Sequence, residues 1–237
     1  MYKRQIQDGR EHVLHTYILG LPELAGRPEA IVAAIDNWSA ENEILMTIGS
    51  ERGDIILGII AQDKPKVMVE LGGYVGYSAL KFGQALRDVG GHRYISLEAS
   101  PEYAEIAQSL IEFGGLSDFV QIVVGPSSST LANLALADPS FRIDILFIDH
   151  SGQVYEQDIK LVESYALLSQ NAVVIADNIL DPNASNYVAK MNTHAWCADP
   201  GSSMAEAPRE VEKFAYESHV LKYKLQSGEP VWEVKLS

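Results

Sequence analysis

After Pro65 the sequence alternates short apolar runs with segments of helical length, and this alternation limits the possible folds more than any other feature. The apolar runs, which we expect to form strands, cover Lys66–Leu71, Arg93–Glu98, Val120–Val124, Ile143–Asp149 and Ala172–Asp177. The helical segments between them cover Ser78–Leu86, Pro101–Gly114, Ser129–Ala137 and Tyr155–Leu168. Continuous Val, Ile and Leu runs are typical of buried parallel strands, and their regular alternation with helices predicts a doubly wound α/β fold.

The two ends of the chain differ from this central pattern. Residues 10–64 have helical periodicity, for example in Arg27–Ser39 and Asp54–Ala61, and predict extra N-terminal helices. Near the other end, Glu212–Leu225 and Val231–Leu236 are typical of two strands in a hairpin, which would add an antiparallel C-terminal strand. The expected sheet is therefore mostly parallel and seven-stranded, with helices on both faces.

Length and composition predict a single domain. At 237 residues and 47% hydrophobic content, the chain can bury one sizeable core. We expect one domain over residues 1–237, with N-terminal helices in 1–64 and the α/β core in 65–237. The segment 193–209 is rich in Gly, Pro, Ser and Ala and predicts a surface loop.

Charge and cysteine content narrow the possible partners and compartments. The formal net charge is −14 and no run of basic residues occurs, which argues against a nucleic-acid partner. No apolar stretch of about 18 residues predicts a membrane span, and Met1–Arg10 lacks the apolar region of a secretory signal. The single cysteine, Cys197, excludes an internal disulfide and a cysteine-built zinc site. We expect a cytoplasmic protein, with a monomer as the default.

The first expected strand ends in an acid and continues into a glycine-rich turn before a helix. The turn contains Gly72, Gly73 and Gly76, and glycine lets the backbone approach a ligand closely. Glu70 stands immediately before it, where a dinucleotide phosphate would be repelled and a cationic amino-acid group would be tolerated better. At the end of the second strand, Glu98 can accept hydrogen bonds from two ribose hydroxyls; alternatively, it caps the next helix.

The fourth and fifth expected strands also end in polar side chains, Asp149-His150 and Asp177-Asn178. If these parallel strands are neighbours, Asp149, Asp177 and Asn178 meet at one edge of the sheet. Three oxygen ligands suit a hard divalent cation that keeps some of its water, Mg²⁺ rather than Zn²⁺. Two alternatives stay open, because Asp-Asn is also a common turn pair and because His150 can be a fourth ligand or contact a neighbouring ligand.

Beyond these single sites, an ordered set of motifs is similar to one known family. The motifs are Glu43-Ile44-Leu45-Met46-Thr47-Ile48-Gly49, Val69-Glu70-Leu71-Gly72-Gly73-Tyr74-Val75-Gly76-Tyr77-Ser78, Ser96-Leu97-Glu98, Val123-Val124-Gly125-Pro126-Ser127, Phe147-Ile148-Asp149-His150 and Ala176-Asp177-Asn178. Over most of its length the chain resembles the catechol O-methyltransferases, particularly their fungal relatives. The resemblance implies a class I methyltransferase with a Rossmann-like, cofactor-binding α/β core that uses S-adenosylmethionine.

The resemblance also implies which residues would bind S-adenosylmethionine. They are Ile48, Glu70, Gly72, Tyr74, Ser78, Glu98, Ser127, Ser128, Asp149 and His150. Within this set Glu98 would hold the ribose, while Ser127, Ser128 and His150 would border the adenine.

On the substrate side, the resemblance implies a metal-assisted reaction with a small catechol-like molecule. Asp149, Asp177 and Asn178 would hold Mg²⁺, which in the family chelates both hydroxyls of a catechol. Chelation lowers the phenol pKa and orients the reacting oxygen toward the methyl group. Glu217 plausibly matches the carboxylate that grips the second hydroxyl.

The sequence departs from the family close to the reacting hydroxyl. An aromatic residue and then a general-base lysine usually follow the Asp-His pair, whereas this chain has Ser151 and Gly152 there. Lys160 lies within an expected helix and does not replace that lysine. Loss of a positioned base commonly lowers the rate by about 10²- to 10⁴-fold. The nearby residues left as catalytic candidates are Tyr155, Glu217 and His150.

These observations support three hypotheses in descending order. The first is a Mg²⁺-dependent O-methyltransferase for a small catechol-like vicinal diol, with an altered base and with Ile44 in place of a pocket aromatic. The second is a catalytically silent or repurposed member that binds S-adenosylmethionine and has a ligand- or partner-binding role. The third is a dinucleotide-dependent oxidoreductase, which Glu70 disfavours.

Overall fold

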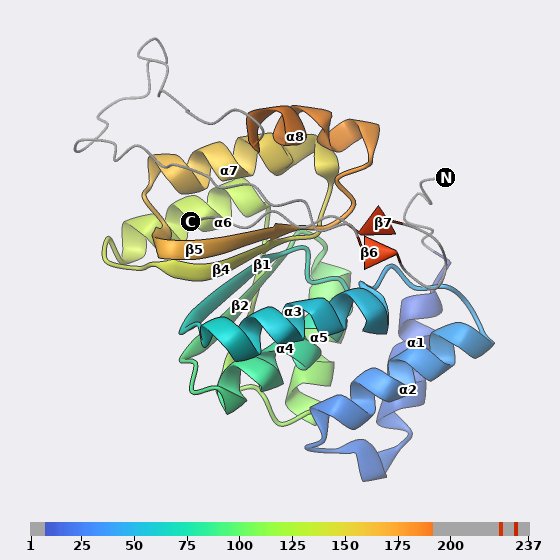
Figure 1. Ribbon diagram of the computed structural model, residues 1–237. Helices are drawn as coiled ribbons and strands as arrows, with labels where there is room; N and C mark the ends of the chain where they lie inside the picture. The colour runs from blue at the N-terminus through green and yellow to red at the C-terminus, as the bar shows by residue number, and fades with distance from the viewer. Residues whose placement is uncertain (1–7, 192–222, 225–229, 232–237) are drawn as a thin grey trace. The chain divides into compact units, whose positions relative to one another are not determined.

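The computed structural model describes residues 8–191, 223–224 and 230–231 (Figure 1). Its contacts divide the chain into two compact units. The first contains residues up to 66 together with 73–125, and the second contains residues 67–72 together with those from 126 onward. The chain therefore passes from the second unit to the first within the glycine-rich turn, between Gly72 and Gly73.

The first unit is mainly helical and contains two strands. Its helices are α1 (Arg10–Leu19), the short 3₁₀ turn η1 (Pro22–Leu24), α2 (Pro28–Glu41), α3 (Gly49–Asp63), α4 (Tyr77–Asp88) and α5 (Pro101–Phe113). Its strands, β2 (Arg93–Glu98) and β3 (Val120–Val124), pair in parallel, with Glu98 opposite Val124. The N-terminal helices expected before residue 64 are thus present as α1, α2 and α3.

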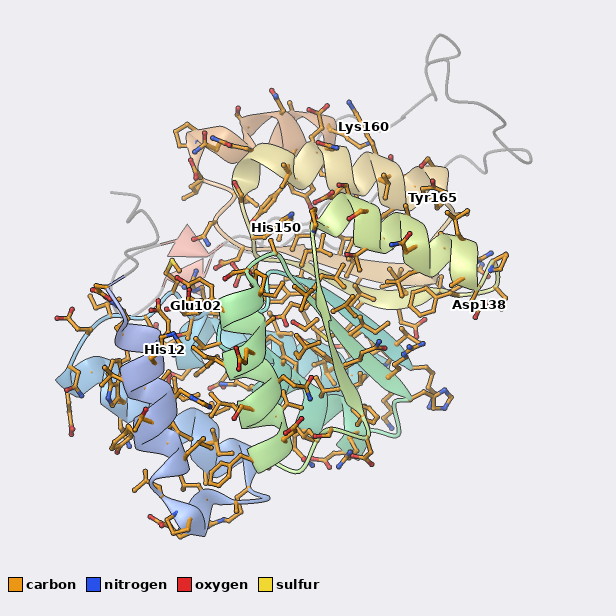
Figure 2. All side chains as sticks on the ribbon, turned by 180° about the vertical axis from the view of Figure 1, so that it is seen from behind. His12, Glu102, Asp138, His150, Lys160 and Tyr165 are labelled. Atoms are coloured by element: carbon orange, nitrogen blue, oxygen red, sulfur yellow. The ribbon has the colours of Figure 1, made fainter. Side chains whose placement is uncertain are left out.

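Local sequence explains why these helices form and which faces they bury. Helix α5 begins with Ser100 as its N-cap, whose side chain accepts the N–H of Tyr103, and with a proline at its first position. Its buried residues recur at helical spacing, as do Glu11, Leu14 and Ile18 of α1. Figure 2 shows His12 of α1 and Glu102 of α5, whose side chains lie 2.8 Å apart.

The second unit is built on three parallel strands. These are β1 (Val67–Leu71), β4 (Ile143–Ile148) and β5 (Leu168–Ala176), with β4 paired to both neighbours. Its helical elements are α6 (Ser127–Ala137), η2 (Gly152–Val154), α7 (Tyr155–Ser164), η3 (Pro182–Ala184) and α8 (Ser185–Met191). Helices α6, α7 and α8 lie on one side of β4 and β5 (Figure 1). Strand β4 is buried except for its partly exposed Asp144, as expected for a central parallel strand.

The strand order of the sheet is β3-β2-β1-β4-β5. This five-stranded sheet agrees with the predicted alternation of strands and helices, whereas the described residues do not show the expected seven strands. Their other strands, β6 (Tyr223–Lys224) and β7 (Pro230–Val231), form a separate antiparallel pair. Most of the expected C-terminal strands and the loop 193–209 lie outside the described residues. No helix in the described part of the chain has the length and apolarity needed to cross a membrane.

Candidate functional site

The carboxyl ends of β1, β4 and β5 form one edge in the second unit. The N–H of Asp149, directly after β4, donates to the carbonyl of Leu71 at the end of β1 over 2.9 Å. The N–H of Asp177, directly after β5, donates to the carbonyl of Ile148 over 2.9 Å. The strand order reverses between β1 and β4, and open α/β sheets bind ligands outside the carboxyl ends at such a point.

This edge brings together Asp149, Asp177 and Asn178, as the sequence predicted. Ile148 pairs with Ala176, so the two aspartates follow matched positions on adjacent strands. The amide nitrogen of Asn178 lies 3.5 Å from Asp149 Oδ1, and Asp177 is only 8% exposed. No group of three His, Cys, Asp or Glu side chains suited to a metal ion occurs among the described residues. The predicted ligand set contains two such residues and an asparagine.

Gly72 lies against the backbone that follows β4. It has a φ of +101°, and a Cβ built on it would lie 2.5 Å from the carbonyl oxygen of Asp149 and 2.9 Å from the Cβ of His150. Only glycine combines this φ with so close an approach. The glycine of the turn is therefore required by the packing of the chain itself.

Tyr155, a predicted catalytic residue, is completely buried beneath the same edge. Its hydroxyl lies 3.3 Å from the carbonyl oxygen of His150 and 3.2 Å from that of Asp177, and can donate to either. Its ring stacks on the His150 ring with the centroids 5.1 Å apart. This geometry suits a residue that holds the ends of β4 and β5 in place.

His150 and Ser127 meet on a buried acid that the sequence reasoning did not identify. Asp158 of α7 is 1% exposed, and its Oδ2 lies 2.6 Å from Ser127 Oγ and 2.7 Å from His150 Nε2. Helix α6 begins at Ser127, two residues earlier than expected, so Ser127 and Ser128 are its first residues. The residues expected to border the adenine thus lie at one end of α6 and directly after β4.

In the first unit, the loop after Gly73 is held by two acids. Tyr74 has a φ of +44°, and its N–H donates to Glu98 Oε2 over 2.7 Å. Glu98 Oε1 accepts the N–H of Ser100 over 2.7 Å, so this carboxylate joins the loop to the start of α5. The Tyr74 hydroxyl donates to Glu11 of α1 over 2.6 Å. Burial, reinforced by the hydrogen bond to Glu11, raises the pKa of Tyr74 above the usual range of a phenol.

The remaining predicted site residues are placed as follows. Ser78 lies in the first turn of α4 and is 8% exposed, and Ile48 precedes α3 and is 5% exposed. Glu70 lies within β1 with its side chain fully buried. Glu217 lies outside the described residues.

The position of the family lysine is crowded by a neighbouring turn. A Cβ on Gly152 would lie 3.2 Å from the backbone nitrogen of Ala184 and 3.3 Å from its Cβ. Ser151 is exposed. Lys160 lies on the surface of α7, 48% exposed, and pairs with Glu156 over 2.7 Å (Figure 2). The described residues therefore place no lysine near Gly152.

A sequence signal for the missed residues Asp158 and Glu11 does exist. Asp158 shares the helical spacing of the buried Tyr155 and Ile159, and Glu11 shares that of the buried Leu14. Acids are almost never fully buried unless they are paired. An acid on the apolar stripe of a predicted helix can therefore be read as a residue with a specific partner.

Comparisons with known proteins agree with this architecture. A family model described as a methyltransferase domain matches residues 69–179. Catechol O-methyltransferase of Bos taurus is 36% identical over 165 residues, which cover 70% of this chain and 60% of the bovine protein. The chain therefore spans about three fifths of that relative's length.

Two further proteins extend the comparison. The structure of an O-methyltransferase from Bacillus cereus in complex with SAH has a TM-score of 0.67 and 17% identity, and the match covers 96% of this chain and 100% of that chain. At this identity the likeness concerns the fold alone. Catechol O-methyltransferase of Sus scrofa is 34% identical over 147 residues, which cover 62% of this chain and 78% of the pig protein. Because about one residue in three is identical over most of the pig protein, the chain belongs to the catechol O-methyltransferase family.

Proposed function

We propose that the protein is an S-adenosylmethionine- and Mg²⁺-dependent O-methyltransferase that acts on a small catechol-like vicinal diol. The observation that carries this proposal is the register of β4 and β5, which sets Asp149 beside Asp177 and Asn178 at a ligand-binding edge. Family membership supports the methyl donor. We also propose a cytoplasmic location and a monomer.

On the donor side, the proposed cofactor residues keep the roles that the resemblance implies. They are Ile48, Glu70, Gly72, Tyr74, Ser78, Glu98, Ser127, Ser128, Asp149 and His150. When bound, S-adenosylmethionine supplies an electrophilic methyl group on a sulfonium. The hydrogen bonds of Glu98 to Tyr74 and Ser100 leave each carboxylate oxygen a further lone pair. One carboxylate can therefore position the loop and also accept ribose hydroxyls.

On the metal side, the donor chemistry of the edge fits Mg²⁺. Asp149, Asp177 and Asn178 offer the hard oxygen ligands that this ion prefers. When bound, Mg²⁺ supplies positive charge that lowers the pKa of a coordinated hydroxyl. Tyr155, through its hydroxyl between the carbonyl oxygens of His150 and Asp177, keeps the two strand ends at a fixed separation. We assign Tyr155 this positioning role rather than proton transfer, because its side chain is completely buried.

A catalytically silent S-adenosylmethionine-binding protein is the second candidate function. The observation that favours it is the contact of Gly152 with Ala184, which leaves little room for a side chain where the family has its base. In that case the same edge would bind a ligand or partner without methyl transfer. Glu217 remains the proposed partner of the second hydroxyl in the active alternative.

Methyl transfer from labelled S-adenosylmethionine to a panel of catechols, with Mg²⁺ and with a chelator, tests the proposal. We expect turnover that the chelator abolishes, and loss of turnover in Asp149→Asn. Asp138→Asn, a change at an exposed acid of the same unit, is the matched control and should keep full activity. Cofactor binding without turnover on any catechol would favour the silent alternative. Absence of cofactor binding would overturn both.

Substitution of Gly152 separates the two candidates further. Gly152→Ala introduces only the Cβ that crowds Ala184, so it controls for packing in the Gly152→Lys variant. If the lysine creates turnover where the parent has none, the parent is silent on that substrate. If the parent is active and both variants lose activity equally, Gly152 belongs to a working site that requires the close packing.

A further inference from the structure

Helix α7 carries two acids on the face that it buries. Its buried residues are Tyr155, Asp158, Ile159, Val162 and Glu163, which recur at the spacing of one helical stripe. Asp158 and Glu163 are each 1% exposed. Burying a carboxylate is costly unless it is paired or hydrogen-bonded, so each of these acids requires an explanation.

Glu163 is explained by a structural ion pair. Its Oε2 lies 2.8 Å from the ammonium of Lys190 in α8, and both side chains are almost fully buried. The pair joins two helices and lies on elements that carry none of the predicted cofactor residues. Glu163 therefore serves the packing of α7 against α8.

Asp158 is different, because its partners are two of the residues proposed to border the adenine. Ser127 Oγ donates to Asp158 Oδ2 over 2.6 Å, and His150 Nε2 lies 2.7 Å from the same oxygen. Asp158 Oδ1 is buried and has no hydrogen-bond partner within the described part of the chain. One carboxylate oxygen thus holds the start of α6 to the residue after Asp149.

This contact also fixes the orientation and the tautomer of His150. Because a carboxylate only accepts, Nε2 carries the proton, and the neutral ring then offers a lone pair at Nδ1. Nδ1 is buried and, among the residues that the structure describes, has no hydrogen-bond partner. The face of the ring stacks on Tyr155. His150 is therefore held by its edge and by its face.

We propose that Asp158 is a positioning residue for the base-binding end of the cofactor site. It acts through Ser127 and His150, which it holds in one arrangement with Nδ1 of the histidine unprotonated. This inference rests on the proposed function, since it assumes that those two residues border the adenine. It predicts that Asp158 affects recognition of the adenine and leaves recognition of the amino-acid end unchanged.

The test compares Asp158→Asn with Glu163→Gln, a matched loss of one buried carboxylate charge on the same helix. Calorimetry on the full chain measures binding of S-adenosylhomocysteine and of S-ribosylhomocysteine, which lacks the adenine. We expect Asp158→Asn to weaken S-adenosylhomocysteine binding by roughly 10- to 100-fold, the range found when a group that orients a ligand-binding histidine is removed. Binding of S-ribosylhomocysteine should not change, and Glu163→Gln should change neither affinity.

Nitrogen NMR of the His150 ring gives a second measurement that needs no ligand. The protonated Nε2 tautomer should dominate in the parent and in Glu163→Gln, and the tautomer ratio should change in Asp158→Asn. If Asp158→Asn does not fold, Ser127→Ala removes one partner of the carboxylate and should lower S-adenosylhomocysteine affinity selectively. Equal loss of both affinities, or an unchanged tautomer, would overturn the inference. A parent that binds no S-adenosylhomocysteine would instead refute the proposed function, while the tautomer would still show whether Asp158 orients His150.

Discussion

Replacement of Gly72 by alanine should damage the protein in two separable ways. The residue has a φ of +101°, and its new Cβ would lie 2.5 Å from the carbonyl oxygen of Asp149. That carbonyl cannot easily recede, because the N–H of Asp149 is hydrogen-bonded to Leu71 over 2.9 Å. The alanine therefore meets backbone atoms on a fixed strand end, where no flexible side chain can move aside.

The size of the loss follows from these two contributions. A left-handed backbone costs an L-residue about 1–2 kcal/mol, and forcing an extra carbon into a packed site costs about 1–3 kcal/mol more. The lower conformational entropy of unfolded alanine returns about 0.4–1 kcal/mol. We therefore expect Gly72→Ala to lower the free energy of unfolding by about 1–4 kcal/mol, a large part of the 5–15 kcal/mol typical of a folded domain.

Gly26→Ala is the matched control for backbone strain. Gly26 has a φ of +70°, but a Cβ on it would meet nothing within 4 Å. Urea unfolding should therefore show a loss about 1–3 kcal/mol smaller for Gly26→Ala than for Gly72→Ala. Below its unfolding transition, Gly72→Ala should also bind S-adenosylhomocysteine more weakly, since the alanine displaces Asp149. Equal losses in the two variants would refute the argument that contact with Asp149 sets the requirement for glycine.

Other parts of the structure give predictions of stability. Tyr74→Phe removes the 2.6 Å hydrogen bond to Glu11, so urea unfolding should show a loss of about 1–3 kcal/mol, and unchanged stability would mean that this bond does not hold the loop. Lys190→Met removes the cation beside buried Glu163 and should cost about 3–5 kcal/mol by the same measurement; a loss below about 1 kcal/mol would contradict a buried pair. Burial holds the pKa of His15 below its usual value of 6.5, so its contribution to stability is lost as the pH falls through 6.5. His15→Asn should therefore make unfolding less sensitive to acid between about pH 7.5 and about pH 5.5, and an equally steep decline would contradict this.

The central strands could be predicted from the sequence because apolar runs report burial directly. The exception is the start of β5, which the sequence placed at Ala172 and the structure places at Leu168. Polar residues 169–171 interrupt the apolar run, and Asn171 has a φ of +65°. The pairing with β4 shifts register here, so the strand loses the regular pattern on which prediction depends.

The ligand edge could be predicted for a similar reason. Residues that directly follow parallel strands share an edge, so Asp149, Asp177 and Asn178 come together whatever the helices do. The closure of the space beside Gly152 could not be predicted in this way. It depends on the contact of two short 3₁₀ turns, η2 and η3, and no periodicity connects residues 152 and 184.

Acids on apolar stripes lie between these two cases. Glu11, Asp158 and Glu163 each occupy a buried helical position, so the sequence alone shows that each must have a partner. It does not show which partner, because that depends on the neighbouring element. In the structure Glu11 accepts from the Tyr74 hydroxyl, Asp158 binds Ser127 and His150, and Glu163 pairs with a lysine. The first two therefore connect helices to the proposed cofactor residues, and changes there should alter binding as well as stability, whereas changes at Glu163 should alter stability alone.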